Sequence, residues 1–307
     1  MRSVRAVGLY LLFVFMGGAL LAPWLYQLMQ VAAGLFPALE SAASKSFPRY
    51  VSRALLGLAL VGLPVFLRAA DLSSWRTLGL GRNSAAVTQL AWGFAFGLVS
   101  LACIAGLALA AGAREVTHEH RVGAVLLHLG KAGLIAAVVA PLEEIFFRGA
   151  LFGSLRKLFH WTAALALSSG VYAMLHFLER SGGIAIVRWN SGFVVLAGMV
   201  SGFADLGKVI PGFLNLTLVG MILGLAYQRL GSLYFSIGLH AGWIFWLKTY
   251  GYITDETAVS RTWLFGTNKL INGWLAFLVL AALLGLLCRH LAQESSHASW
   301  KDRRLLS

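Results

Sequence analysis

The sequence predicts an all-α protein, a polytopic bundle of transmembrane helices. Composition gives the first reason: 59% of the 307 residues are hydrophobic and only 12% are charged, whereas soluble domains are about 45 to 50% apolar. The second reason is a succession of long apolar runs. The first of them, near 7–36, is much longer than the apolar core of a signal peptide, which has about 7 to 15 residues. We therefore expect a first membrane span here and not a cleaved leader.

About 20 apolar residues cross a bilayer as one helix, and on this basis the chain has eight or nine spans. They are predicted near residues 7–30, 52–68, 87–112, 124–157, 161–178, 191–204, 211–229, 231–249 and 271–290. The sixth is short and could instead be a re-entrant segment, which is why the count is eight or nine. One multi-pass membrane domain is expected over 1–307, ending in a polar, basic tail at 291–307.

The formal net charge of +13 would suggest a nucleic-acid partner for a soluble chain. Here the basic residues gather at the ends of apolar runs, where cytoplasmic loops and anionic lipid headgroups favour them. The expected partner is therefore the lipid bilayer and not nucleic acid. Cys103 and Cys288 each lie within an apolar run, so neither a disulfide framework nor a cysteine metal site is expected.

Three charged residues stand inside the apolar stretch APLEEIFFRG, residues 140–149. An ionised side chain near the bilayer centre costs about 2.5 to 3.5 kcal/mol, so Glu143, Glu144 and Arg148 need an explanation. Residues four apart share a helical face, which predicts an ion pair between Glu144 and Arg148, while Glu143 points about 100° away. Pro141 removes a backbone hydrogen bond and is expected to bend the helix. A buried ion cluster that fixes helix packing would by itself explain these charges.

Two histidines, His176 and His240, also lie well inside apolar runs, on separate predicted spans. A single intramembrane histidine is more often a hydrogen-bonded packing residue than a catalyst. Two of them together with a glutamate, on three spans, form a convergent set that is typical of an active site. The sequence has no H-E-x-x-H zinc motif and no G-x-S-x-G nucleophile motif. Ser168 and Ser169 are better explained as small residues that let helices approach closely.

Three motifs in order resemble the CPBP family: E-E-x-x-x-R from Glu143 to Arg148, an aromatic residue four before a histidine at Tyr172 and His176, and His240 in a later span. That family consists of intramembrane proteases, including CAAX prenyl proteases of the Ras-converting-enzyme type, and bacterial proteins linked to bacteriocin self-immunity. The resemblance covers about residues 125–249, the expected catalytic core. It implies an intramembrane endopeptidase that cuts CAAX-like or other membrane-associated peptides. The expected location is the bacterial inner (plasma) membrane.

Carried over to this chain, the resemblance implies a role for each motif residue. Glu143 would activate the attacking water, and His176 would help to hold this water or a metal. Glu144 and Arg148 would support the site. His240 would polarise the scissile carbonyl or act as a ligand.

Two positions depart from the family pattern. Tyr172 stands where the family usually has phenylalanine. Ile244 stands four residues after the third-motif histidine, where asparagine is common, and its hydrocarbon side chain cannot donate a hydrogen bond to an oxyanion. Asn215 is the substitute donor that the sequence offers.

The residues leave open whether a metal takes part. Two histidines and a glutamate match the ligand set of many catalytic zinc sites, in which case His176 and His240 would bind zinc. The same groups could act without metal, the glutamate as general base and the histidines as donors. We prefer the metal-free scheme, because Glu143 does not easily serve as ligand and base at once. Two other classes of function also fit intramembrane charges: a proton- or cation-coupled transporter, and a catalytically inactive membrane scaffold with the same fold.

Overall fold

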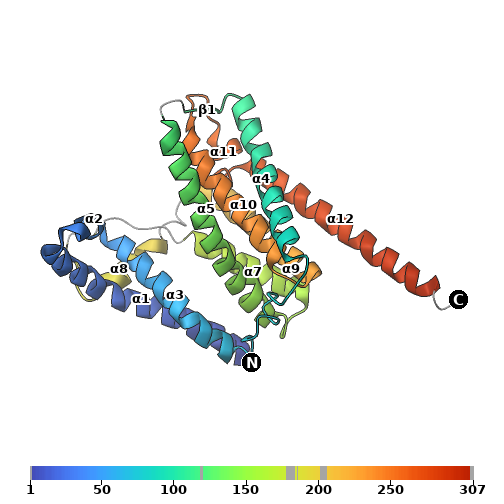
Figure 1. Cartoon of the computed structure of the whole chain (residues 1–307), viewed down its shortest axis with the longest axis horizontal. Helices are drawn as coiled ribbons and strands as arrows, with labels where there is room; N and C mark the ends of the chain where they lie inside the picture. The colour runs from blue at the N-terminus through green and yellow to red at the C-terminus, as the bar shows by residue number, and fades with distance from the viewer. Residues whose placement is uncertain (1, 118–119, 178–183, 185, 201–205, 305–307) are drawn as a thin grey trace. The chain divides into compact units, whose positions relative to one another are not determined.

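The computed structural model is helical almost throughout, as Figure 1 shows. It describes residues 2–117, 120–177, 184, 186–200 and 206–304. Within this part of the chain the strands are two segments of three residues each. The predicted all-α class is therefore confirmed.

The chain divides into two compact units. Unit 1 comprises Met1–Ser74 and Met174–Leu206, and unit 2 comprises Trp75–Ala173 and Gly207–Ser307. The expectation of one multi-pass domain over 1–307 stays a prediction.

Unit 1 is built on two long helices, α1 (Arg2–Leu35) and α3 (Phe47–Ala69), which lie side by side. The short helices η1 (Pro37–Leu39) and α2 (Glu40–Ala43) connect them, and α8 (Ser191–Met199) packs against both. The three longer helices, α1, α3 and α8, meet in an apolar core of buried hydrophobic side chains. They are Ala22, Phe47, Tyr50, Val51, Ala54, Val195 and Met199.

Unit 2 has α10 (Tyr234–Ile253) at its centre, with α4 (Ala86–Ala110) and α5 (Val122–Glu144) packed against it. Figure 1 shows these three helices side by side. The chain continues from α5 through a π-helical segment, η2, and reaches α7 after a short helical turn. The remaining helical elements are η2 (Ile145–Phe152), α6 (Gly153–Leu155), α7 (Trp161–His176), α9 (Leu206–Leu230), α11 (Thr262–Phe265) and α12 (Trp274–Arg304).

Glycine lets the backbones of α4 and α10 approach closely. A Cβ atom added at Gly97 would lie 2.5 Å from the Leu239 carbonyl oxygen, and one added at Gly242 would lie 2.5 Å from the Phe94 carbonyl oxygen. Neither neighbour is the end of a flexible side chain, so neither can move aside. Small residues at such positions let helices associate tightly in a membrane. This contact fixes α10, which carries His240, against α4.

Replacing Gly97 with valine is expected to lower the free energy of unfolding by about 1 to 3 kcal/mol, the usual effect of overpacking a close contact. Thermal unfolding of the purified protein in detergent measures this. Gly106→Val is the matched control, because Gly106 lies on the same helix and has open space around it. A Gly97→Val protein as stable as the Gly106→Val protein would contradict the close approach of the two backbones.

Ser169 confirms the role that the sequence predicts for small residues. A Cβ atom added at Gly220 of α9 would lie 2.7 Å from the Ser169 Cβ atom of α7. The two helices therefore touch at this point. The contact brings the backbone of α9 next to the helix that carries Tyr172.

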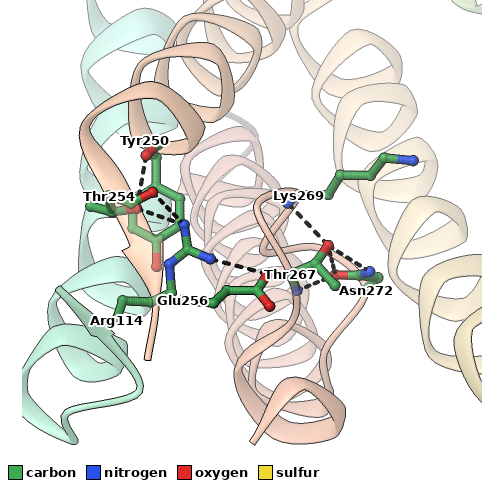
Figure 2. A network of polar contacts seen from close by, with 7 residues as sticks. All are labelled: Arg114, Tyr250, Thr254, Glu256, Thr267, Lys269 and Asn272. Atoms are coloured by element: carbon green, nitrogen blue, oxygen red, sulfur yellow. Dashed lines mark hydrogen bonds and ion pairs between the residues drawn. The ribbon is translucent and has the colours of Figure 1, made fainter. Parts of the chain in front are cut away.

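A two-stranded antiparallel sheet, β1 (Arg114–Val116) with β2 (Thr254–Glu256), ties the end of α4 to the end of α10. The Arg114 guanidinium is almost fully buried, donates to the Thr254 carbonyl oxygen at 2.7 Å and lies 3.2 Å from a Glu256 carboxylate oxygen. Figure 2 shows these contacts, with the ring of Tyr250 beside the guanidinium. The ion pair and the sheet hold the two helix ends together.

Five helices among the described residues are long and apolar enough to cross a membrane. α7 with 16 residues and α8 with nine are too short for a crossing of about 20 residues. α10 has 20 residues, but His240 and Lys248 reduce its hydropathy. The predicted count of eight or nine spans is therefore not confirmed. The five are Arg5–Leu35, Phe47–Ala69, Ala86–Ala110, Val122–Leu155 and Val209–Leu230.

The predicted polar tail, 291–307, is helical as far as Arg304, because α12 continues without a break from its apolar part, Trp274–Arg289. The helix thus passes from an apolar to a polar composition along its length. The last three residues lie outside the described part of the chain.

Candidate active site

Both glutamates lie at the C-terminal end of α5, where the helix changes its winding. Pro141 is inside α5, and the helix continues through it to Glu144. The next eight residues, Ile145–Phe152, are π-helical. Widened helical turns of this kind are rare and occur frequently at functional sites. The proline therefore does not end the helix, and the change of winding begins directly after the two carboxyl groups.

The predicted ion pair between Glu144 and Arg148 is present. Arg148 Nη1 donates to Glu144 Oε1 at 2.8 Å, and both side chains are almost completely buried. The other terminal nitrogen of Arg148 lies 3.5 Å from the Gly220 carbonyl oxygen of α9. The charge of each group is compensated by the other, which is the condition under which a buried ion pair is tolerated.

His240 of α10 completes this cluster. Its Nδ1 atom lies 2.8 Å from Glu144 Oε1, the oxygen that also binds Arg148. Its Nε2 atom lies 3.7 Å from Glu143 Oε2. His240 is therefore held by one glutamate and faces the other, although 96 residues of sequence separate it from Glu144.

The tautomer of His240 follows from these contacts. Glu144 Oε1 accepts a hydrogen bond from Arg148, so it acts as a carboxylate acceptor, and the Nδ1 atom of His240 must be the donor to it. In the neutral ring this leaves Nε2 with its lone pair. A carboxylate that fixes the ring and its tautomer in this way is a common support for a functional histidine.

Tyr172 of α7 is the fifth side chain of the cluster. Its hydroxyl lies 3.5 Å from His240 Nε2, and its ring meets the His240 ring edge to face at a centroid distance of 6.2 Å. The Arg148 guanidinium lies over the Tyr172 ring at 4.6 Å from the centroid. The sequence identified Tyr172 only as the aromatic residue of a motif. Its hydroxyl was the available signal, since phenylalanine would have served for packing.

The two glutamates differ in exposure. Glu144 is completely buried, whereas 28% of the Glu143 side chain is accessible. The two carboxyl groups therefore lie in different environments, and of the two only the Glu143 side chain is partly accessible. The difference agrees with the helical spacing, which placed the two side chains on different faces of α5.

Comparison with known proteins gives a match for the part of the chain that contains this cluster. Residues 124–246 match a family model described as type II CAAX prenyl endopeptidase Rce1-like. This segment is similar to the Rce1-like family. The match confirms the resemblance predicted from the three motifs and supports a peptidase. No curated protein and no solved structure shows a significant match to the chain.

The Rce1-like segment also contains His176, the last residue of α7. His176 lies four residues after Tyr172 and so on the same face of the helix. It belongs to unit 1, whereas the other predicted site residues belong to unit 2. Its membership of the site therefore stays a prediction.

The described part of the Rce1-like segment contains no ready-made set of metal ligands. Among the residues that the structure describes, no group of three or more His, Cys, Asp or Glu side chains is arranged to hold a metal ion. One carboxylate oxygen of Glu144 is already shared by Arg148 and His240. In this arrangement Glu144, Arg148 and His240 bind one another and are not arranged as ligands of one metal ion.

Asn215 does not fill the place left by Ile244. Its side-chain amide is completely buried and donates to the Ile271 carbonyl oxygen at 2.7 Å and to the Gly273 carbonyl oxygen at 2.9 Å. Both amide hydrogens are thus used to fasten the segment before α12. The expectation that Asn215 supplies an oxyanion donor is not supported by these contacts.

An open apolar groove with a volume of about 620 Å³ lies between α4, α5 and α10. Pro141, which precedes Glu143 by two residues, and Ala241, which follows His240, both line it. The rest of the lining is hydrocarbon, aromatic or glycine, and the charged side chains of the cluster are not part of it. The other lining residues are Val87, Leu90, Ala91, Phe94, Gly133, Ala136, Ala137, Tyr234, Ile237 and Gly238.

Proposed function

We propose that this chain is an intramembrane endopeptidase in which Glu143 is the general base. The observation that carries the proposal is the convergence of Glu143, Glu144, Arg148 and His240 within a segment that matches a peptidase family. These side chains come from α5, η2 and α10. Ionisable residues inside a membrane bundle are expensive and therefore mark functional sites.

Glu143 suits the role of base because its side chain is partly accessible. The base must reach both a water molecule and the substrate, and Glu144 is completely buried and engaged by Arg148. Glu144 instead holds His240 in place. The two carboxyl groups thus have different roles: Glu143 activates the water, and Glu144 holds the imidazole of His240.

His240 is proposed to orient the attacking water. Its Nε2 lone pair can accept one hydrogen of a water molecule while Glu143 accepts the other. The oxygen lone pair of that water is then free to attack a carbonyl carbon. This role differs from the polarising role that the family resemblance implied, and it follows from the donor state of Nδ1. The role of His176 in holding a water or a metal, which the resemblance implies, stays a prediction.

The apolar groove supports a substrate with a hydrocarbon group or apolar side chains near the scissile bond. We propose a CAAX-like prenylated peptide or another membrane-associated peptide as the substrate class. The chain is an integral membrane protein, and we propose the bacterial inner membrane as its location.

Comparative proteomics tests the proposal for any substrate that the membrane contains. Membranes that contain the wild-type protein should show new peptide termini, and membranes with an equal amount of the Glu143→Ala protein should lack them. Termini that are identical in the two membranes would contradict an endopeptidase based on Glu143.

We further propose that the reaction proceeds without a metal ion. Metal analysis of the purified protein is then expected to find little zinc, and chelators should leave cleavage unchanged. His176→Ala and His240→Ala should lose cleavage rate without losing a bound ion. About one zinc ion per chain, lost in both histidine variants, would overturn the metal-free scheme and would leave the peptidase proposal standing.

A further inference from the structure

Peptide hydrolysis needs a hydrogen-bond donor for the oxyanion, and three residues considered for that role do not provide one. Ile244 has only a hydrocarbon side chain. The amide hydrogens of Asn215 are used by two carbonyl groups. His240 donates through Nδ1 to Glu144, so its neutral ring offers only an acceptor at Nε2.

We infer that the Tyr172 hydroxyl is the oxyanion donor of the proposed peptidase. This inference rests on the proposed function and assigns it a further catalytic residue. The hydroxyl lies 3.5 Å from His240 Nε2, and His240 Nε2 lies 3.7 Å from Glu143 Oε2. Donor, imidazole and base are thus neighbours. Catalytic hydrogen bonds are often long before substrate binds and shorten in the reacting complex.

The ring of Tyr172 is fixed from two sides, which preorganises its hydroxyl. The Arg148 guanidinium lies 4.6 Å from the ring centroid, and the Phe147 ring meets it at 88° with a centroid distance of 4.9 Å. The residue is only 2% exposed. The hydroxyl oxygen is thus held in place, and only its hydrogen has to turn from His240 Nε2 to the oxyanion.

The proposed step begins with the water molecule that Glu143 activates. The water oxygen bonds to the scissile carbonyl carbon, and one water proton passes to Glu143. The former carbonyl oxygen becomes an oxyanion that accepts a hydrogen bond from the Tyr172 hydroxyl, which keeps its proton. When the carbon–nitrogen bond breaks, Glu143 returns the proton to the leaving nitrogen. The oxyanion becomes a carbonyl again, the products are a carboxylic acid and an amine, and a proton passes between these two to give a carboxylate and an ammonium group. Tyr172 is unchanged.

Tyr172→Phe is the test variant, because it removes the hydroxyl and keeps the ring that packs against Arg148 and Phe147. Loss of one oxyanion donor typically lowers kcat about 10²- to 10³-fold. We expect that decrease for cleavage of a prenylated C-a-a-X peptide by the full chain in liposomes, with KM nearly unchanged. Tyr250→Phe is the matched control. Tyr250 is equally buried, and its ring lies beside Arg114 and not in the candidate active site, so the loss of its hydroxyl should leave kcat unchanged.

Binding of a tetrahedral anion separates a donor from a residue that only positions His240. A phosphinic peptide carries such an anion at the scissile position, and the uncleaved C-a-a-X peptide does not. The Tyr172→Phe change should weaken binding of the phosphinic peptide about 10²-fold or more and leave affinity for the uncleaved peptide nearly unchanged, measured in the Glu143→Gln background. Equal weakening of both would show a positioning role and overturn the inference.

The outcomes also distinguish this inference from the proposed function. A wild-type protein that cleaves, a Glu143→Gln protein that does not, and a Tyr172→Phe protein with wild-type kcat would overturn the role of Tyr172 alone. Cleavage that does not depend on Glu143 would overturn the proposed function. Absence of cleavage by the wild type would overturn both.

Discussion

Replacing Glu143 with glutamine is expected to abolish detectable peptide cleavage while the protein accumulates and unfolds like the wild type. Glutamine keeps the size and shape of the side chain and cannot accept the proton of the attacking water. Removal of a general base typically lowers the rate by about 10²- to 10⁴-fold. Stability should hold, because Glu143 is partly accessible and the buried pair of Glu144 and Arg148 is untouched. Cleavage rate and thermal unfolding of the same purified sample measure the two properties.

Glu115→Gln is the control for the chemical change itself. Glu115 is exposed on β1, far in sequence from the site, so its amide variant should cleave at the wild-type rate. Wild-type cleavage by a pure Glu143→Gln protein would refute the assignment of the base. Loss of cleavage together with a lowered unfolding temperature would point to a structural role for Glu143.

The second large effect concerns stability. Arg148→Ala is expected to lower the free energy of unfolding by about 3 to 5 kcal/mol, because it leaves the completely buried Glu144 without its cation. The abundance of the protein in membranes and its thermal unfolding in detergent should both decrease. Arg121→Ala is the control, because Arg121 is exposed before α5 and surface substitutions usually change stability by about 0.5 kcal/mol or less.

A double variant tests whether the unpaired charge of Glu144 causes the loss of stability. Adding Glu144→Gln to Arg148→Ala removes the carboxylate that lost its partner, so part of the lost stability should return. If the double variant is no more stable than Arg148→Ala, the destabilisation comes from lost packing of the guanidinium against Tyr172 and not from the unpaired charge.

The local features of this fold were predictable because they depend on neighbours in the sequence. Helical spacing alone predicted the pair of Glu144 and Arg148, since residues four apart meet on any α-helix. Apolar composition predicted an all-helical membrane protein. The number of spans was harder to predict, because an apolar run indicates that a segment is buried but not whether protein or lipid surrounds it. α7 and α8 are apolar, yet they have only 16 and nine residues.

The non-local contacts of the site could not be derived from spacing. His240 and Glu144 meet because α10 packs against α5, and their distance in the sequence carries no information about that packing. The engagement of Asn215 with the Ile271 and Gly273 carbonyl groups was equally invisible. For His240 the order of the motifs gave the information that helical spacing could not give. The resemblance grouped His240 with the two glutamates before the fold was known.

The most direct test of the central claim is the mass of the cleavage product formed in ¹⁸O-labelled water. Purified wild-type protein in liposomes should convert a prenylated C-a-a-X peptide into two fragments, and the new carboxylate should carry one ¹⁸O atom from the water that Glu143 activates. The Glu143→Gln protein, tested beside it, should yield no such product. An uncleaved peptide with the wild type, or an equally labelled product with both proteins, would contradict the account.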